Sequence, residues 1–119
     1  MSESPQALAW QAAEAIRSLN HAADGLGQPG DAYDVLGGLS QAASRLPQAL
    51  AQLGRWLAAA LAAGQLGCSD GTDPAVAVSG AWMFISDARG SAAALAENLS
   101  LAQQQLSAVS GQPGPEEQP

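Results

Sequence analysis

Two long stretches of this chain carry apolar residues that alternate three and four positions apart, and this spacing constrains the fold more than any other feature. The first stretch consists of Leu36, Leu39, Ala43, Leu46, Leu50, Leu53, Leu57 and Ala60. The second consists of Val78, Ala81, Ile85, Ala88, Ala92, Leu95, Leu99, Ala102, Leu106 and Val109. Such a heptad pattern keeps one face of a helix directed towards a neighbouring helix. We therefore predict two long helices packed as an antiparallel hairpin, with the chain turning at residues 64–74.

Pro47 and Gly90 lie inside these two predicted helices. Proline removes one backbone hydrogen bond and clashes with the carbonyl group four residues earlier, so it kinks or breaks a helix. The heptad phase continues across Pro47, which favours a kink. For the last segment we predict one helix from about residue 74 to about residue 110, and a bend near Gly90 is the alternative.

A third amphipathic segment precedes these two. Ser4 and Pro5 suit the N-cap and the first position of a helix. The sequence GLGQPGD at residues 25–31 is rich in glycine and ends this helix. Its apolar residues are again three and four positions apart, which predicts one buried face. They are Leu8, Ala12, Ala15, Leu19, Ala22 and Leu26.

The composition agrees with a helical chain. Ala and Leu, which form helices most readily, supply most of the apolar residues, whereas aromatic and β-branched residues are few. We predict an all-α protein: an antiparallel bundle of three long helices with coiled-coil-like heptad seams, or of four helices if the chain bends at Pro47 or Gly90. With 119 residues, one domain over residues 1–110 is expected. The Pro- and Glu-rich residues 111–119 are predicted to be disordered.

The decapeptide GCSDGTDPAV at residues 67–76 is the one stretch that suggests a cation-binding loop. A calcium loop of the EF-hand type needs oxygen ligands at several fixed positions and a closing Glu, and here only Asp70 and Asp73 supply carboxylates. A turn explains more of the residues. Gly67 ends one helix, Gly71 supplies a turn, Asp73 caps the next helix and Pro74 takes its first position. We interpret the stretch as a turn.

No other group of residues suggests catalysis or a bound metal. His21 and Cys68 are the only residues of their kinds and are too few for a zinc site. His21 is expected to be a solvated side chain near a helix C-terminus. Asp31 and Asp34 are close in sequence, but acidic residues at the start of a helix stabilise its N-terminal dipole. We therefore expect a protein that is not an enzyme and that holds no cofactor and no metal.

The charge excludes some classes of partner. The net charge is −7 and there is no Lys, which argues against a nucleic acid or an anionic membrane surface as the partner. The longest apolar stretch, residues 75–85, has about half the length that a membrane span needs. The N-terminal residues do not have the pattern of a signal peptide. A cytoplasmic protein without a membrane span is the expectation.

A cluster of large apolar residues lies off the predicted seams at the end of the hairpin that residues 55–64 and 75–85 form. Trp82, Met83 and Phe84 are consecutive, so they point in directions about 100° apart and cannot all face one helix. Trp56 and Leu61 lie near the end of the preceding predicted helix. The first helix is expected to cover about residues 31–50 and to leave this end uncovered. We predict that these five residues bind a protein partner.

Several interpretations of this cluster stay open. Bends at Pro47 and Gly90 would convert it into an internal core. Otherwise it binds either a second copy of the chain, giving a homodimer, or another helical protein as an accessory subunit. The alternative from another class is a carrier that lodges an apolar small ligand between helices near Trp56 and Trp82.

In its general shape, the predicted hairpin resembles the small secreted helical-hairpin proteins of type VII (ESX) systems. That family carries W-x-G between its helices and Y-x-x-x-[DE] near its C-terminus. Here the three tryptophans are followed by QA, LA and MF, and Tyr33 has Gly37 four residues later, so both motifs are absent. No functional residue and no secretion is therefore carried over. More broadly, the chain resembles small Ala/Leu-rich helical proteins of high-GC actinobacteria, which implies no activity.

Overall fold

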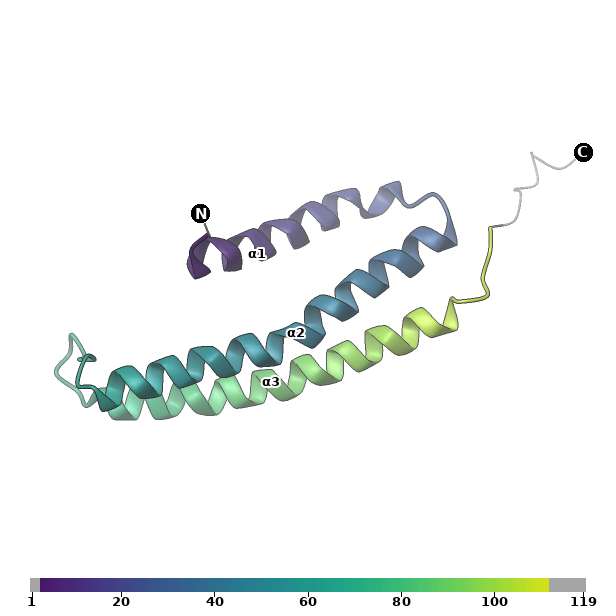
Figure 1. Cartoon of the computed structure of the whole chain (residues 1–119). Coiled ribbons are helices and arrows are strands. Elements are labelled where there is room, and N and C mark those ends of the chain that lie inside the picture. The colour runs from purple at the N-terminus through teal and green to yellow at the C-terminus, as the bar shows by residue number, and fades with distance from the viewer. Residues whose placement is uncertain (1–2, 112–119) are drawn as a thin grey trace, which may run out of the picture. The chain divides into compact units, whose positions relative to one another are not determined.

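The computed structural model describes residues 3–111, and among these the regular elements are all helical. α1 spans Pro5–Ala22 and is followed by a short 3-10 helix, η1, at Ala23–Gly25. α2 spans Pro29–Ala62 and α3 spans Pro74–Gln105 (Figure 1). The predicted all-α class with three long helices is confirmed. The predicted disordered tail lies outside the described residues except for Gly111.

The chain divides into two compact units. Of the described residues, one unit comprises 3–32 together with 109–111, and the other, called the hairpin unit below, comprises Tyr33–Ala108. The first unit contains α1. As predicted, Ser4 caps this helix, since its hydroxyl accepts a hydrogen bond from the backbone N–H of Ala7 at 3.1 Å. His21 lies exposed in the last turn.

The apolar stripe predicted for the first helix is present but is not buried. α1 contains no buried residue, and the stripe residues Leu8, in α1, and Leu26, after η1, are exposed. The helix also ends at Ala22, because the next three residues form η1 and not a further α-helical turn. Half of the stripe consists of Ala, which offers little side chain to bury. Within its own unit, α1 therefore has no buried face.

The start of α2 uses an acidic residue as predicted. The carboxylate of Asp31 accepts hydrogen bonds from the backbone N–H groups of Gly27 and Gln28 at 3.0 and 3.2 Å. These N–H groups lie at the helix N-terminus, where they have no partner within the helix. Asp31 therefore stabilises the start of α2, which is the structural role that the sequence predicted for it.

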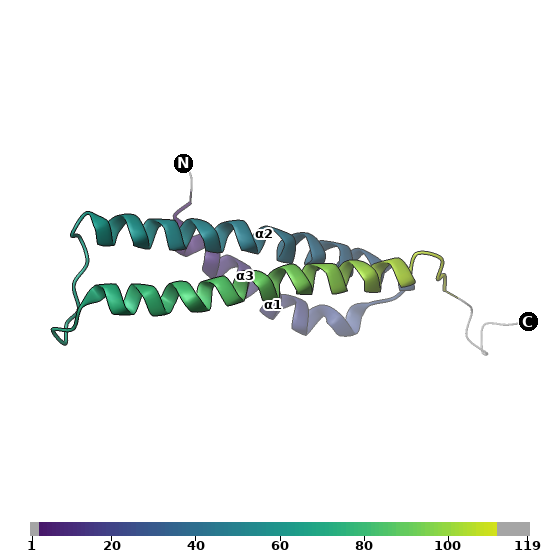
Figure 2. The same ribbon diagram turned by 90° about the horizontal axis from the view of Figure 1, so that it is seen from below.

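Within the hairpin unit, α2 and α3 lie side by side and antiparallel (Figures 1 and 2). The Ser40 hydroxyl donates to the carbonyl oxygen of Ala96 at 3.1 Å, and the Gln103 side-chain amide donates to the carbonyl oxygen of Tyr33 at 3.1 Å. Further along, Trp82 lies against Gly54. In all three pairs the two residue numbers add to the same total, so one antiparallel register holds along the hairpin.

The residues buried between α2 and α3 are all small. None of the described residues with a large side chain is fully buried. The buried residues of the hairpin are Ala43, Ala51, Gly54, Ala60, Ala92 and Ala96. Small side chains let two helix backbones approach each other closely, and the hydrogen bond from a serine on α2 to a backbone carbonyl of α3 shows such an approach. The seam is therefore a narrow contact of Ala and Gly.

Several alternate positions of the predicted heptads are displaced by one residue. Residues spaced by seven, such as Ala43, Leu50 and Leu57, lie on the seam or beside it as predicted. Of the positions between them in α2, Ala60 is buried and Leu39 is at least half-buried as predicted, whereas Leu46 and Leu53 are exposed. The residues that follow the displaced positions are at least half-buried instead. These are Pro47 and Gly54 in α2 and Arg89, Ala96 and Gln103 in α3.

Both long helices are continuous. Pro47 lies inside α2 and Gly90 inside α3, and neither ends its helix. α2 changes direction near its middle (Figure 1), where proline removes a backbone hydrogen bond. α2 is therefore one kinked helix, and the four-helix alternative, in which a bend at Pro47 or Gly90 gives two separate helices, is not found in the described part of the chain.

The loop between α2 and α3 forms a turn from local hydrogen bonds. α2 ends at Ala62, and Gly64 follows it with φ at +71°. The N–H of Gln65 donates to the carbonyl of Ala60, and that of Gly64 to the carbonyl of Leu61, both at 3.0 Å. This is a Schellman motif, in which glycine takes the left-handed conformation. The prediction that Gly67 ends this helix is wrong, because Gly64 is the first glycine available.

Candidate functional site

The stretch that suggested a cation loop uses its carboxylates to order the chain. Asp70 accepts hydrogen bonds from the hydroxyl of Thr72 at 2.7 Å and from its backbone N–H at 3.0 Å. These bonds, the hydroxyl bond first, hold the pKa of Asp70 below its usual value. Asp73 accepts from the N–H of Ala75 at 2.9 Å and caps α3, as predicted. In the described part of the chain, no three His, Cys, Asp or Glu residues are grouped as a metal site would require.

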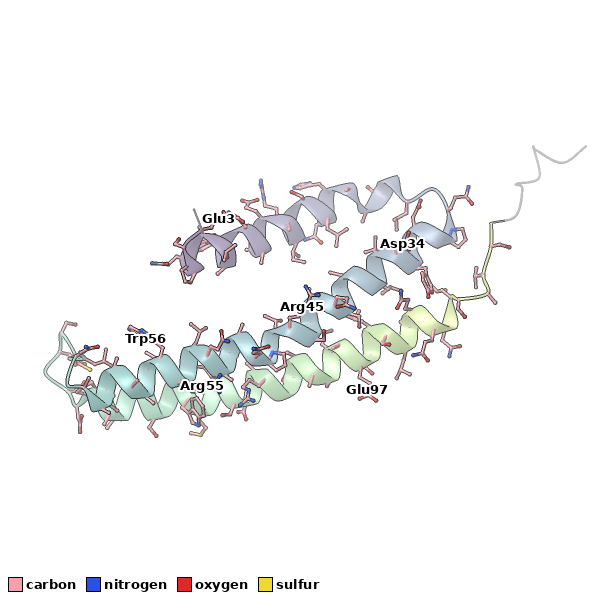
Figure 3. All side chains as sticks on the ribbon, in the orientation of Figure 1. Glu3, Asp34, Arg45, Arg55, Trp56 and Glu97 are labelled. Atoms are coloured by element: carbon pink, nitrogen blue, oxygen red, sulfur yellow. The ribbon has the colours of Figure 1, made fainter. Side chains whose placement is uncertain are left out.

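The five residues predicted to bind a partner do not form one patch. Trp82 and Leu61 line a pocket on one side of the seam. Trp56 is 63% exposed and projects from α2 away from α3 (Figure 3). Met83 and Phe84, which are 62% and 74% exposed, point outward from α3 on either side of its outer surface. The structure thus separates Trp82 and Leu61 from the other three residues.

Trp82 lies on the seam, whereas the sequence placed it outside. Gly54 is directly opposite, and a Cβ atom at that position would overlap the ring carbons Cζ3 and Cε3 of Trp82. The missing side chain of Gly54 therefore provides the space for the indole ring. Sequence reasoning missed this pairing because it assigned the seam to Leu53 on the basis of hydrophobicity. The only signal was that one small residue and one large residue face each other in the antiparallel register.

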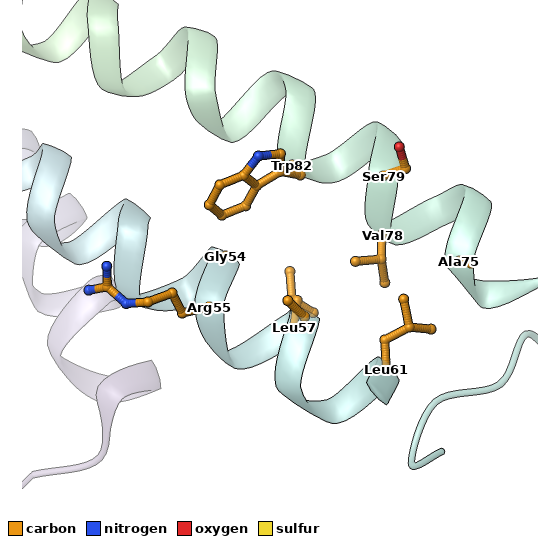
Figure 4. Close-up of a pocket in the computed structure, with 9 residues that line it drawn as sticks. Gly54, Arg55, Leu57, Leu61, Ala75, Val78, Ser79 and Trp82 are labelled. Carbon is orange, nitrogen blue, oxygen red and sulfur yellow. The ribbon is translucent and has the colours of Figure 1, made fainter. Parts of the chain in front are cut away.

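The pocket beside Trp82, called the Trp82 pocket below, has a volume of about 310 Å³. It lies entirely within the hairpin unit and has mainly apolar walls. Trp82 and Arg55 lie at one end, Leu57 and Val78 in the middle, and Leu61 at the other end (Figure 4). The lining residues are Gly54, Arg55, Leu57, Ala58, Leu61, Ala75, Val78, Ser79 and Trp82.

The other side of the hairpin presents a second apolar surface, called the Leu53 face below. On α2 it contains Leu46, Leu53 and Trp56, with exposed fractions of 46%, 55% and 63%. Ala49 completes a stripe with spacings of three, four and three. On α3, Ala81, Ala88 and Leu95 precede the seam residues in the same way as Leu46 and Leu53 do on α2. In an antiparallel pair these positions lie on the same side, and Phe84 extends this stripe outward.

The Leu53 face contains leucines that the sequence had assigned to the seam. The helix carries two overlapping heptad stripes, and the periodicity alone does not say which faces the neighbouring helix. Leu46 and Leu53 were for this reason not recognised as surface residues. The small size of Ala43, Ala51 and Gly54 was the signal that could have located the close contact.

Comparison with known protein families, curated proteins and solved structures finds no match to this chain. Among residues 3–111, no helix combines the length and the apolar character needed to cross a membrane. The functional argument therefore depends on the two surfaces of the hairpin unit.

Proposed function

We propose that this chain is a helical protein–protein interaction module, and that its partner is a second copy that covers the Leu53 face. The observation that carries the proposal is the division of residues within the hairpin. Its buried residues are Ala and Gly, whereas Leu46, Leu53, Trp56 and Phe84 remain exposed. A soluble helix ordinarily buries its largest apolar side chains.

The free energy at stake favours an additional contact. Full burial of one large apolar side chain contributes about 1.5–3 kcal/mol. An alanine seam buries much less apolar area per residue. Covering the four large side chains of the Leu53 face would therefore contribute several times the free energy of burying one such residue. The uncovered hairpin lacks this contribution.

The spacing of the Leu53 face fits a second helical hairpin. In a four-helix bundle each helix packs against two neighbours, so it needs two adjacent apolar stripes. Each hairpin helix has both: the alanine seam and the stripe beside it. A second hairpin related by a two-fold axis brings the same stripes against themselves, which closes the assembly at two chains.

Charge on the hairpin is compatible with this contact. The stripe of Leu46, Ala49, Leu53 and Trp56 contains no charged residue, and the polar side chains of Gln48 and Gln52 lie outside it. The net charge of −7 is therefore carried by other surfaces. Arg45 lies at the edge of the stripe, four residues before Ala49 and eleven before Trp56, and is exposed. Two Leu53 faces can meet with this cation at the rim, where it stays in water and avoids the cost of burying an unpaired charge.

Paired substitutions at Leu53 and Gln52 test the proposal. Leu53→Asp should convert a dimer into a monomer, because it would place a carboxylate in the apolar contact of each copy. Gln52→Asp makes the same negative charge one residue away, outside the stripe, and should leave the dimer intact. The masses are measured by sedimentation equilibrium, and circular dichroism checks that both variants keep their helices.

Leu53→Ala adds a milder variant without a new charge. It removes most of the side chain but keeps the helix, so it should weaken the dimer to an intermediate degree. If Leu53→Asp and Gln52→Asp have the same mass at every concentration, the Leu53 face is not the contact.

A further inference from the structure

We propose that the second copy lies on the Leu53 face end over end, so that α2 packs antiparallel on α2 of that copy and the guanidinium of Arg45 lies on the indole ring of Trp56 of the second copy. This inference rests on the proposed function, because it states how the same surface is occupied. The chemistry at the two ends of the α2 stripe carries it.

The two ends of this stripe carry different kinds of side chain. Arg45 lies at one end and is exposed, and Trp56 lies at the other end and is 63% exposed. Eleven residues are close to three helical turns, so both side chains lie on the same side of α2 (Figure 3). Between them the stripe consists of Leu46, Ala49 and Leu53. The stripe therefore has a cation at one end and an exposed aromatic ring at the other.

Arg45 has only a weak polar contact within its own chain. Its guanidinium donates to the side-chain oxygen of Gln41 at 3.4 Å, on the surface. Over residues 3–111 the one ion pair joins Arg17 to Glu14, so Arg45 has no carboxylate partner there. A cation over the face of an aromatic ring is attracted by the ring, most strongly by Trp and most often from Arg. The ring of Trp56 suits Arg45 chemically, but it lies about 16 Å along the same helix, beyond the reach of the side chain.

A two-fold axis that crosses the helices brings the two groups together. It packs α2 on α2 of the second copy in the reverse direction. With the axis at residues 50 and 51, midway along the stripe, Arg45 of each copy lies level with Trp56 of the other. Two cation–ring pairs then form at the rim of the contact, where the guanidinium keeps part of its water.

The other two-fold arrangement leaves Arg45 without such a partner. An axis parallel to the helices packs α2 on α3 of the second copy. In the register of the hairpin, Arg45 is level with Ser91, so it would face that part of α3. The Leu53 face there consists of Ala88 and Leu95, which have neither an aromatic ring nor a negative charge. The cation therefore favours the axis that crosses the helices.

The same axis also suits α3. Residues 85 and 86 of α3 are level with residues 50 and 51 of α2 in the register of the hairpin. Phe84, which is 74% exposed, therefore lies beside the axis. The two copies of Phe84 come within about 5 Å of each other along the helix direction, and aromatic rings pack favourably at such separations. One axis thus accounts for both exposed aromatic residues of the Leu53 face.

Distances between spin labels distinguish the two arrangements. Gln52→Cys and Ala59→Cys, each combined with Cys68→Ser, place one label at exposed positions seven residues apart on the same side of α2. In the proposed dimer the two labels at residue 52 are about 5 Å apart along the helix direction, and those at residue 59 about 25 Å apart. The measured distance should therefore be clearly longer at residue 59. An axis parallel to the helices gives equal distances at both positions.

A double-mutant cycle tests the cation–ring pair itself. Arg45→Gln should raise the dissociation constant of the dimer about five- to thirtyfold, because each dimer contains two such pairs. Arg55→Gln removes the same charge from the same helix at a residue that lines the Trp82 pocket, and should have little effect. In a Trp56→Leu background, Arg45→Gln should lose most of its effect. Sedimentation equilibrium gives the constants, and circular dichroism checks the helices.

The possible results separate this inference from the proposed function. A dimer with equal label distances at residues 52 and 59, or one that Arg45→Gln weakens no more than Arg55→Gln does, would overturn the end-over-end arrangement and leave self-association standing. An effect of Arg45→Gln that persists in full in the Trp56→Leu background would also overturn it. A chain that keeps the mass of one copy at every concentration would overturn both proposals.

Discussion

Replacing Gly54 by Ala tests the seam between α2 and α3. A Cβ atom at this position would overlap two carbons of the Trp82 ring. The indole is rigid, so the whole ring has to move out of the helix contact. Overpacking of this kind costs about 1–3 kcal/mol, whereas the change from Gly to Ala within a helix contributes about 1 kcal/mol of stability. We expect a net loss of up to about 2 kcal/mol in the free energy of unfolding.

Gly38→Ala is the matched control. Gly38 also lies in α2, but a Cβ atom there would meet nothing within 4 Å. This variant should gain about 1 kcal/mol from helix propensity alone. Because that gain is common to both variants, the difference between them, about 1–3 kcal/mol, measures the overlap with Trp82. Urea unfolding followed by circular dichroism gives both values, at one protein concentration because association shifts apparent stability.

A double-mutant cycle attributes the effect to Trp82. In a Trp82→Ala background the overlap is absent, so Gly54→Ala should stabilise the protein as Gly38→Ala does. If Gly54→Ala stabilises the protein with Trp82 still present, the indole ring does not occupy the space above Gly54. A seam in which Gly54 faces Trp82 would then be refuted.

Two further predictions follow from polar groups in the hairpin unit. Arg89 has a buried Nε atom without a hydrogen-bond partner, so Arg89→Leu should raise the melting midpoint. The same change at the exposed Arg45 should not raise it. A lower melting midpoint for Arg89→Leu would contradict this prediction. Thr72→Val should raise the pKa of Asp70 towards its usual value in an NMR titration, because the hydroxyl bond lowers it. Because the pKa of Asp70 is lowered in the folded state, its contribution to stability is present at neutral pH and is lost as the pH falls through the folded pKa. An unchanged pKa of Asp70 in Thr72→Val would show that the hydroxyl is not the cause.

Helix locations and their caps could be predicted from the sequence, because they depend on local chemistry. Ser4 and Asp73 cap their helices as expected, since a side-chain oxygen next to a free backbone N–H group needs no distant partner. The end of α2 was misplaced by three residues because Gly64 and Gly67 are both suitable C-terminal glycines. The sequence offers no rule for choosing between them.

The contact surfaces could be predicted only in part, because they depend on how closely the helices approach. Periodicity located the residues spaced by seven, such as Leu50 and Leu57, on the inner side. It could not distinguish Leu53 from Gly54 as the residue between them. Hydrophobicity favoured Leu53, but the close approach of two backbones favours a residue without a side chain. The same misassignment concealed both the Leu53 face and the pairing of Trp82 with Gly54.

Whether the apolar stripe of α1 is buried could not be predicted from the sequence. Its apolar stripe has the period of a buried face, yet α1 contains no buried residue. A periodic pattern shows that a helix has an apolar side, and it does not identify what covers that side.

The mass of the wild-type chain in solution, measured over a wide range of concentrations, tests the central claim most directly. The chain mass is 11.9 kDa. If a second copy covers the Leu53 face, the mass should rise with concentration to twice this value and stop there, because a two-fold contact closes on itself. The melting midpoint should rise over the same range. A chain that keeps the mass of one copy at every concentration would contradict the account.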